Sequence, residues 1–190
     1  MFTKSTKTLL GVLALAAIFT LTLAGPVSAS AIERGGPGGS NGNWQSGGTG
    51  LAAAQTAVTP LSADESEALQ AAILEEYGAY NLYTAAAAEY GSLTPFARIA
   101  RSEQQHINSL TRMADLYGVE IPANPGLTGE LDFASLADAC QAGVDAEIAD
   151  AALYDELTPV TTHADLLRVY DRLQSASLDN HLPAFETCAP

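Results

Sequence analysis

Basic residues are scarce in this sequence, and lysine is nearly absent. Eight lysines and arginines stand against 22 aspartates and glutamates, so the formal net charge is −14 over 190 residues. Both lysines, Lys4 and Lys7, lie close to the amino terminus. Binding to nucleic acid or to an anionic membrane surface needs clustered Lys and Arg, so the composition argues against both partners. The acidic surface would concentrate cations, although a role in solubility alone explains it equally well.

Familiar catalytic motifs are missing as well. The sequence contains no serine, cysteine and histidine triad, no phosphate-binding glycine loop and no paired zinc–cysteine motif. It also contains no convincing strand pattern, whereas long stretches show the spacing of helices. We therefore expect an all-α fold whose function depends on other groups.

One apolar run stands near the amino terminus. It covers residues 9–24, follows the two lysines and precedes small residues up to position 31. This layout predicts a secretory signal peptide over residues 1–31, cleaved after Ala29 or Ala31. A retained membrane anchor is the alternative, but the run is short for a membrane span. We expect a secreted or cell-envelope protein that meets the membrane only during export.

Residues 32–60 are rich in glycine and cannot form a core. Glycine clusters occupy residues 35–39 and 47–50. This composition predicts a flexible spacer, which leaves residues 61–190 as one folded domain.

Helix signals divide the folded domain into four segments. Capping residues, glycines and prolines set their expected bounds at about 63–90, 95–117, 136–158 and 163–181. The first two helices are joined by a short turn at Gly91, so they must lie antiparallel. His163, at the start of the last helix, is expected to be exposed.

Each expected helix carries ionisable side chains on an otherwise apolar face. The second helix shows this best, because Glu103 and His106 share a stripe with Ile99 and Leu110. Leaving such groups unpaired in the interior would cost several kcal/mol, so they need mutual partners, water or a metal cation. The full set is Glu76, Glu103, His106, Glu147, Asp150 and His181.

Metal binding explains these six residues best. Four carboxylates gathered without a cation would repel one another and take up protons. Two divalent cations balance that charge, as in a carboxylate-bridged di-metal centre inside a helical bundle. The alternatives are a salt-bridged polar core, or faces that are in fact turned to solvent.

Four stretches of the chain resemble a known group of proteins. They are residues 75–83 around Glu76, 102–106 around the Glu103-x-x-His106 step, 143–150, and 177–185 around His181. Over residues 61–186 the chain resembles the ferritin-like superfamily and, more narrowly, the domain-of-unknown-function 2202 family. The resemblance implies an up-down four-helix bundle with a crossover between the second and third helices, and it implies no settled activity.

The fourth helix departs from the full di-iron pattern of that superfamily. A second Glu-x-x-His step needs an acid at position 178, where this chain has Leu178. Asp150, one turn after Glu147, is the candidate for the missing oxygen ligand. The register is also awkward, because Glu147 and His181 differ by about 12 Å in their distance from the connecting turn at 1.5 Å per residue. Either this turn climbs along the third helix, or His181 is not level with Glu147.

The two cysteines bear on the same register. Cys140 precedes Glu147 by seven residues, and Cys188 follows His181 by seven. If the two ligands are level on antiparallel helices, the cysteines meet at one end of the bundle. In an exported protein this pair predicts a disulfide, which would stabilise the fold by about 3 to 4 kcal/mol for a loop of this length. Free thiols and thiolate ligation are the alternatives.

We expect two metal ions, iron with manganese as the alternative, with Glu103 as the bridge. Glu76 and His106 would hold one ion, and Glu147, Asp150 and His181 the other. Such a centre reacts with oxygen or peroxide, or oxidises ferrous ions. A metal-binding module without turnover and a structural bundle with a vestigial site are the alternatives. No catalytic residue is assigned, and both enzymatic activity and a homodimeric state are left open.

Some neighbouring residues are candidates for supporting roles. Tyr80 and Tyr83 lie within two turns of Glu76, where they either bond a ligand and pass electrons or simply fill the core. Hydrogen-bond donors that orient the ligands are expected among Ser102, Ser177 and Asn180.

Overall fold

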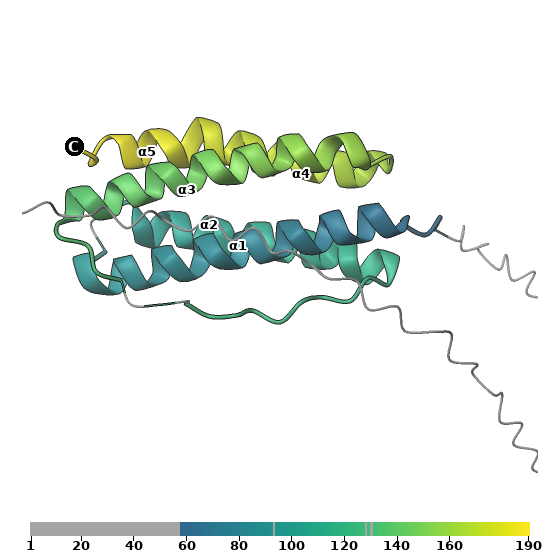
Figure 1. Ribbon diagram of the computed structural model, residues 1–190, viewed down its shortest axis with the longest axis horizontal. Coiled ribbons are helices and arrows are strands. Elements are labelled where there is room, and N and C mark those ends of the chain that lie inside the picture. Colours follow the sequence, from purple (N-terminus) through teal and green to yellow (C-terminus); the bar gives the residue numbers. More distant parts are fainter. Residues whose placement is uncertain (1–57, 93, 128, 130) are drawn as a thin grey trace, which may run out of the picture. The chain divides into compact units, whose positions relative to one another are not determined.

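The computed structural model describes residues 58–190 except positions 93, 128 and 130. The expected signal peptide (1–31) and residues 32–57 of the expected spacer lie outside the described residues. The four long helices are α1 (Ala63–Tyr90), α2 (Phe96–Tyr117), α3 (Leu136–Leu157) and α4 (Ala164–Ala176). No strand occurs in the described part of the chain (Figure 1). The prediction of an all-α helical bundle is confirmed.

Capping residues set the helix ends much as the sequence indicates. Before α1, Ser62 Oγ accepts a hydrogen bond from the Glu65 backbone nitrogen at 3.2 Å, and Glu65 Oε2 accepts one from the Ser62 backbone nitrogen at 2.9 Å. Gly118 ends α2 with a φ of 68°, a left-handed conformation that suits glycine. α2 begins one residue later than expected, since Pro95 is its cap.

The connection between α2 and α3 runs lengthwise along the bundle (Figure 1). α2 and α3 therefore point in the same direction, while α1 and α4 point the other way. Hydrogen bonds attach the connection to three successive positions of α1. Gln70 Nε2 donates to the Glu120 carbonyl, the side-chain amides of Asn81 and Asn124 bond each other, and the Tyr90 hydroxyl donates to the Phe133 carbonyl.

The fourth helix consists of three parts with different hydrogen-bond patterns. After α4 a π turn follows as η2 (Ser177–His181), and α5 (Leu182–Glu186) ends the helix. Before α4, the 3₁₀ turn η1 (Thr158–Val160) lengthens α3. At about 2 Å per residue, η1 accounts for about 6 Å of the expected mismatch. The π turn fits more residues into one turn and shortens the return path. His181 Nδ1 consequently lies 3.4 Å from Glu147 Oε2, so the two residues are level.

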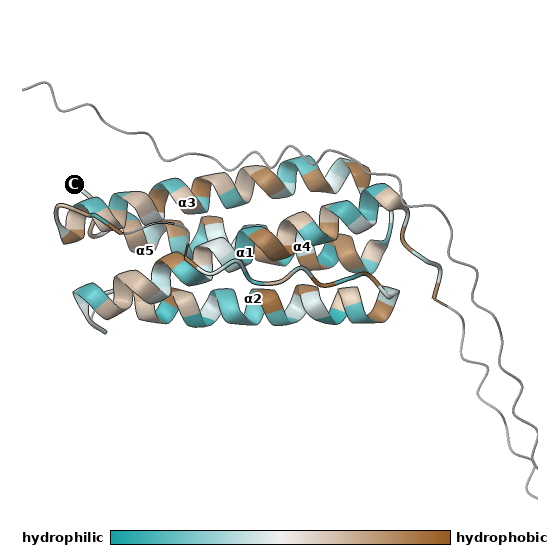
Figure 2. Cartoon of the chain, turned by 60° about the horizontal axis from the view of Figure 1, so that its bottom comes forward, coloured by the Kyte–Doolittle hydropathy of each residue, from teal (hydrophilic) through white to brown (hydrophobic). Residues whose placement is uncertain are grey.

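Two apolar clusters fill the bundle, and a polar layer separates them. On every helix, the ionisable residues predicted above fall between members of the two clusters. Hydrophobic and hydrophilic residues alternate along α2 in Figure 2, as expected for a helix with one buried face. The largest fully buried members of one cluster are Leu69, Ile73, Leu110, Tyr154, Leu166 and Tyr170, and those of the other are Tyr83, Phe96, Ile99 and Phe185.

A disulfide joins α3 to the carboxyl-terminal end of the chain. Cys140 and Cys188 are bonded, with their Cα atoms 5.7 Å apart, which confirms the predicted pairing. The two helices approach closely here, because a Cβ atom at Gly143 would lie only 2.7 Å from the Phe185 ring. Glycine at position 143 thus lets α5 pack against α3 and keeps His181 on the inner side.

Candidate metal centre

All six residues predicted from the sequence are buried in the polar layer. They come from α1 (Glu76), α2 (Glu103, His106), α3 (Glu147, Asp150) and the π turn (His181). None of them is more than 6 % exposed. No arginine is buried among the described residues, so no cationic side chain other than histidine balances the four carboxyl groups.

The first cluster of ligand atoms joins α1 and α2. His106 Nδ1 lies 3.2 Å from Glu76 Oε2 and 2.7 Å from Glu103 Oε2. Each of the three residues offers one ligand atom, and these atoms lie within 4.8 Å of one another. Glu103 and His106 are three residues apart, which places both on one face of α2. The geometry is that of a site that can hold one metal ion.

The second cluster joins α2, α3 and the π turn. His181 Nδ1 lies 2.9 Å from Glu103 Oε1 and 3.4 Å from Glu147 Oε2. These ligand atoms also lie within 4.8 Å of one another. Glu103 therefore belongs to both clusters, with Oε2 facing His106 and Oε1 facing His181. The two imidazole rings are stacked with their centres 5.4 Å apart.

Two atoms at the shared carboxylate lack hydrogen bonds. Glu103 Oε1 and His181 Nδ1 are buried and lie 2.9 Å apart, yet neither makes a hydrogen bond of suitable geometry. Leaving a buried polar atom in this state costs about 1–3 kcal/mol, and a cation shared by the two atoms would satisfy both. Carboxylate oxygens combined with imidazole nitrogens suit first-row divalent ions such as iron, manganese and zinc. The residues present therefore fit a metal cation.

Asp150 lies in the same layer but belongs to neither cluster. Its Oδ2 accepts a hydrogen bond from Ser177 Oγ at 2.6 Å, while its Oδ1 is buried without a partner. Leu178, at the position where the resemblance requires an acid, is 42 % exposed. The π turn thus contributes a hydroxyl and an imidazole to the centre, and Asp150 keeps one oxygen unengaged.

Two tyrosines donate hydrogen bonds to the outer carboxylates. Tyr83 of α1 donates to Glu147 Oε1 of α3 at 2.7 Å, and Tyr154 of α3 donates to Glu76 Oε1 of α1 at 2.6 Å. Each tyrosine follows a glutamate of its own helix by seven residues, so the antiparallel helices exchange equivalent bonds. Sequence reasoning singled out Tyr83 but missed Tyr154. The spacing of Glu76 and Tyr83 recurs in Glu147 and Tyr154, and this repeat could have indicated the role of Tyr154.

Burial and hydrogen bonding separate the pKa values in the metal-free centre. Burial raises the pKa of Glu76 to about 7 and that of Asp150 well above its usual range. For Glu103, burial is outweighed by the two histidines that lie against its oxygens, which lower its pKa to about 2. Burial would lower the histidine pKa values, but contacts with Glu103 and its partners raise that of His106 to about 10 and that of His181 to about 9. In the absence of a cation, protons bound to the groups with raised pKa values balance the negative charge of the centre.

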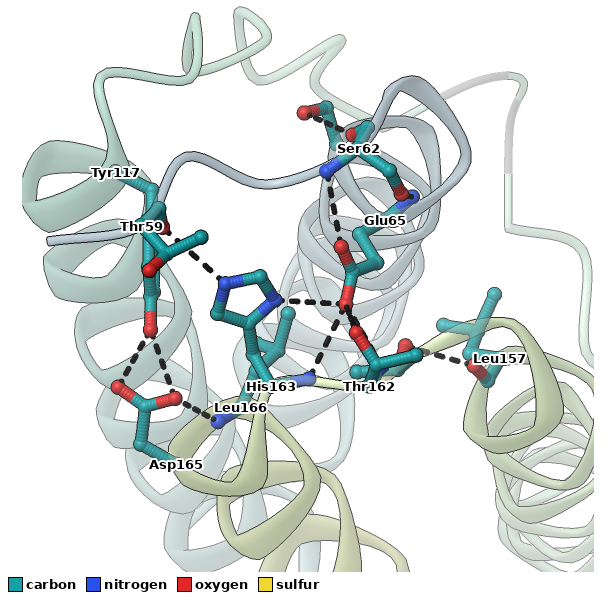
Figure 3. Close-up of polar contacts among 11 residues, drawn as sticks. Thr59, Ser62, Glu65, Tyr117, Leu157, Thr162, His163, Asp165 and Leu166 are labelled. Atoms are coloured by element: carbon teal, nitrogen blue, oxygen red, sulfur yellow. Dashed lines mark hydrogen bonds and ion pairs between the residues drawn. The ribbon is translucent and has the colours of Figure 1, made fainter.

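A fifth buried carboxylate, outside the polar layer, lies at the end of the bundle where α1 begins (Figure 3). Glu65 Oε1 accepts hydrogen bonds from the Thr162 backbone, the Thr162 hydroxyl and the His163 backbone at 2.7 to 3.1 Å. It also lies 2.8 Å from His163 Nδ1. These donors outweigh burial and hold the pKa of Glu65 well below its usual range. The expectation that His163 is exposed is therefore wrong, because Glu65 holds it against the turn before α4.

Comparison with known proteins reveals similarity in fold. No family model matches the chain, and no curated protein matches it. A crystal structure described as a hypothetical protein from Methanococcus jannaschii shares 25 % sequence identity with this chain, at a TM-score of 0.60. The match covers 67 % of this chain and 80 % of the other. This likeness supports the helical-bundle architecture and assigns no activity.

Proposed function

We propose that this chain is an exported ferritin-like protein, related to the domain-of-unknown-function 2202 family, that binds two metal ions in its polar layer. Glu103 bridges the two ions, Glu76 and His106 complete the first site, and Glu147, His181 and Asp150 complete the second. One observation carries this proposal. The two oxygens of Glu103 face two different histidine–glutamate pairs, and one of these oxygens has no other partner.

Iron is the proposed metal, with manganese as the alternative. When bound, such a pair of ions would supply redox chemistry that reduces oxygen or peroxide, including reactions in which ferrous substrate ions provide the electrons. The protein's own groups hold the ligands in place. Burial and the neighbouring carboxylates raise the pKa values of Tyr83 and Tyr154 well above their usual range, so both phenols stay protonated and donate to the outer glutamates. Ser177 orients Asp150 in the same way.

A metal-binding module without turnover is the second candidate. The burial of all six residues favours it, because closed sites retain an ion whereas catalytic sites keep a position open to substrate. Both candidates need the same ligands and differ only in whether the bound ions react.

The disulfide supports export, because such bonds persist in oxidising compartments and are rare in the cytosol. Within the described residues, no helix combines the length and the apolar character needed to cross a bilayer.

Metal analysis of the purified protein beside the Glu103→Ala/His106→Ala variant tests the proposal. We expect about two ions per chain in the wild type and fewer than about 0.2 in the variant, because both sites lose the shared ligand. Glu67→Ala, which removes an exposed acid of α1, is the control and should keep the metal. Fewer than about 0.2 ions per chain in wild type and variant alike would rule out both candidates.

Rapid mixing of the metal-loaded protein with peroxide or oxygen separates the two candidates. A change in the absorption spectrum within seconds favours the redox centre. A spectrum that is unchanged over minutes favours the module without turnover.

A further inference from the structure

A pocket of about 420 Å³ opens between α2 and the π turn. Arg98, Arg101 and Ser102 of α2 line it, together with His181 of the π turn. His181 also takes part in the metal centre, where its Nδ1 approaches Glu103. The pocket therefore meets the outer edge of an imidazole whose inner edge faces the proposed ions.

The pocket is cationic in a protein that is strongly acidic. It holds two of the six arginines in a chain whose formal net charge is −14. Arg98 and Arg101 are exposed, and within the described residues neither pairs with a carboxylate. Arg101 Nε donates to the carbonyl of Ala97 at 3.1 Å, which leaves its two terminal nitrogens for another partner. No other arginine of the described residues pairs with a carboxylate either, so the distinguishing feature of Arg98 and Arg101 is that both line one pocket.

Ser102 places a further donor at the inner wall. Its Oγ lies 3.0 Å from His181 Nε2. When Nε2 carries a proton, the imidazole donates a hydrogen bond to Ser102 Oγ rather than accepting one. The hydroxyl hydrogen of Ser102 is then available to the pocket. The amides of Gln105 and Asn180, which also line it, offer two more sets of N–H donors.

We infer that this pocket binds a small oxyanion, of the phosphate or carboxylate class, beside the metal centre. Guanidinium groups pair with such anions through parallel N–H···O bonds, and Ser102 adds a bond from the inner side. The anion site itself does not need a metal ion. Its coupling to the centre rests on the proposed function, because bound cations would cancel the carboxylate charge that repels an anion.

Calorimetric titration of the full-length protein with inorganic phosphate, and separately with malonate, tests this inference. Arg98→Gln/Arg101→Gln removes both guanidinium groups from the pocket. Arg112→Gln/Arg172→Gln removes the same charge from exposed positions outside it and is the matched control. We expect one saturable site in the wild type and the control, with affinity at least about tenfold weaker in the pocket variant. The tighter of the two anions identifies the class.

A second variant guards against a general loss of fold. Ser102→Ala keeps both arginines and should weaken anion binding about threefold. Circular dichroism should show the wild-type helix content in all variants. If both double arginine variants weakened anion binding equally, the change in net charge alone would explain the effect, and the inference would be overturned. A wild-type protein that binds neither anion would also overturn it.

Titrations with and without Mn²⁺ separate this inference from the proposed function. Mn²⁺ should tighten anion binding in the wild type but not in Glu103→Ala/His106→Ala. An anion affinity that does not change with Mn²⁺ would support the anion site in the pocket and contradict its coupling to a metal centre. Metal-loaded protein that binds neither anion would overturn the pocket while the proposed function stands.

Discussion

The bundle buries carboxylates in two places, which differ in whether hydrogen-bond donors reach the lone pairs of the carboxylate oxygens. At the start of α1, both oxygens of Glu65 receive hydrogen bonds, one from Ser62 and the other from the turn before α4. In the central layer, Glu103 Oε1, Asp150 Oδ1 and His181 Nδ1 are buried without any hydrogen bond. Both regions are acidic and closed, but only the central one has unmatched ligand atoms.

This difference distinguishes a carboxylate that only stabilises the fold, such as Glu65, from carboxylates that can bind an ion, such as those of the central layer. A carboxylate whose lone pairs all meet donors of the same chain has nothing left with which to bind an ion, and its role is to fix a turn. Carboxylates that converge without enough donors need a cation or protons. Unmatched lone pairs, rather than buried charge alone, are therefore the evidence for a metal centre.

Exchanging one carboxylate for an amide in each region gives the largest contrast. Glu103→Gln removes the bridging charge, so we expect the metal content to fall from about two ions per chain to fewer than about 0.2. Glu65→Gln should keep both ions. Elemental analysis of the two purified variants measures this contrast. Normal metal content in Glu103→Gln would erase the distinction between the two regions.

The pH dependence of stability in the metal-free protein should have two limbs: His106 and His181 act at alkaline pH, and the lowered pKa values of Glu65 and Glu103 act at acidic pH. The raised pKa values of His106, about 10, and His181, about 9, stabilise the fold fully below pH 6.5. That contribution is lost as the pH rises from 6.5 toward 9 and 10, at up to about 1.4 kcal/mol per pH unit for each histidine. The lowered pKa of Glu65 stabilises the fold above pH 4.5, and this contribution is lost as the pH falls below that value.

Urea unfolding of the chelated protein between pH 3 and 9 measures both limbs. Glu65→Gln should shrink the acidic limb to the part that Glu103 contributes, while the loss due to His106 and His181 should remain on the alkaline limb. A chelated wild type whose stability rises between pH 6.5 and 9 would show that the two histidines do not carry the expected charge.

Metal addition should stabilise only proteins with an intact central layer. At a free metal concentration of 100 times Kd, the free energy of unfolding rises by about 2.7 kcal/mol for one site. We expect this shift in the wild type and in Glu65→Gln, and no shift in Glu103→Gln. Calorimetric melting curves with and without metal test it, and an equal shift in all three proteins would indicate non-specific binding.

Removal of the Glu65 charge should cost stability rather than binding. The amide of Glu65→Gln keeps only one acceptor oxygen, so either the Ser62 donor or the donors of Thr162 and His163 are left unmatched, and we expect a loss of about 2 kcal/mol. Denaturant unfolding at pH 7 measures it. Asp64→Asn, on an exposed neighbour in the same turn, is the control and should change stability little.

Loss of a tyrosine hydroxyl should have the smallest effect. Tyr154→Phe removes the donor to Glu76, and Tyr83→Phe removes the donor to Glu147, each at a cost of about 1 kcal/mol in the metal-free protein. The exchange of equivalent bonds between α1 and α3 predicts similar losses for the two variants. A loss confined to one variant would show that the two sides of the centre differ.

Local signals account for most of what the sequence predicted. Capping residues, glycines and prolines predicted the helix bounds, and the 3.6-residue period placed ionisable groups such as Glu76 and Glu147 on buried faces. The heptad spacing of Cys140 and Cys188 from the ligands gave the disulfide. Each of these depends on residues within a few turns of one another, or on simple antiparallel register.

The features that the sequence did not reveal depend on contacts between distant segments. The 3₁₀ and π turns arise because the last two helices must bring His181 level with Glu147. Glu65 is explained locally by its capping box, so its hydrogen bonds to Thr162, 97 residues further along the chain, leave no additional local signature. Ligation by Asp150 stays a prediction, because its unengaged oxygen lies outside both clusters.

The two ligand clusters divide unequally between the two halves of the fold. The first draws its ligands from the α1–α2 hairpin alone, whereas the second combines Glu103 of that hairpin with Glu147 and His181 of the half that the disulfide closes. An ion in the first site therefore strengthens one hairpin, and only an ion in the second fastens the halves together. Amide exchange would report these as separate events, with fraying inside the hairpin slowed by one ion and separation of the halves slowed by the other.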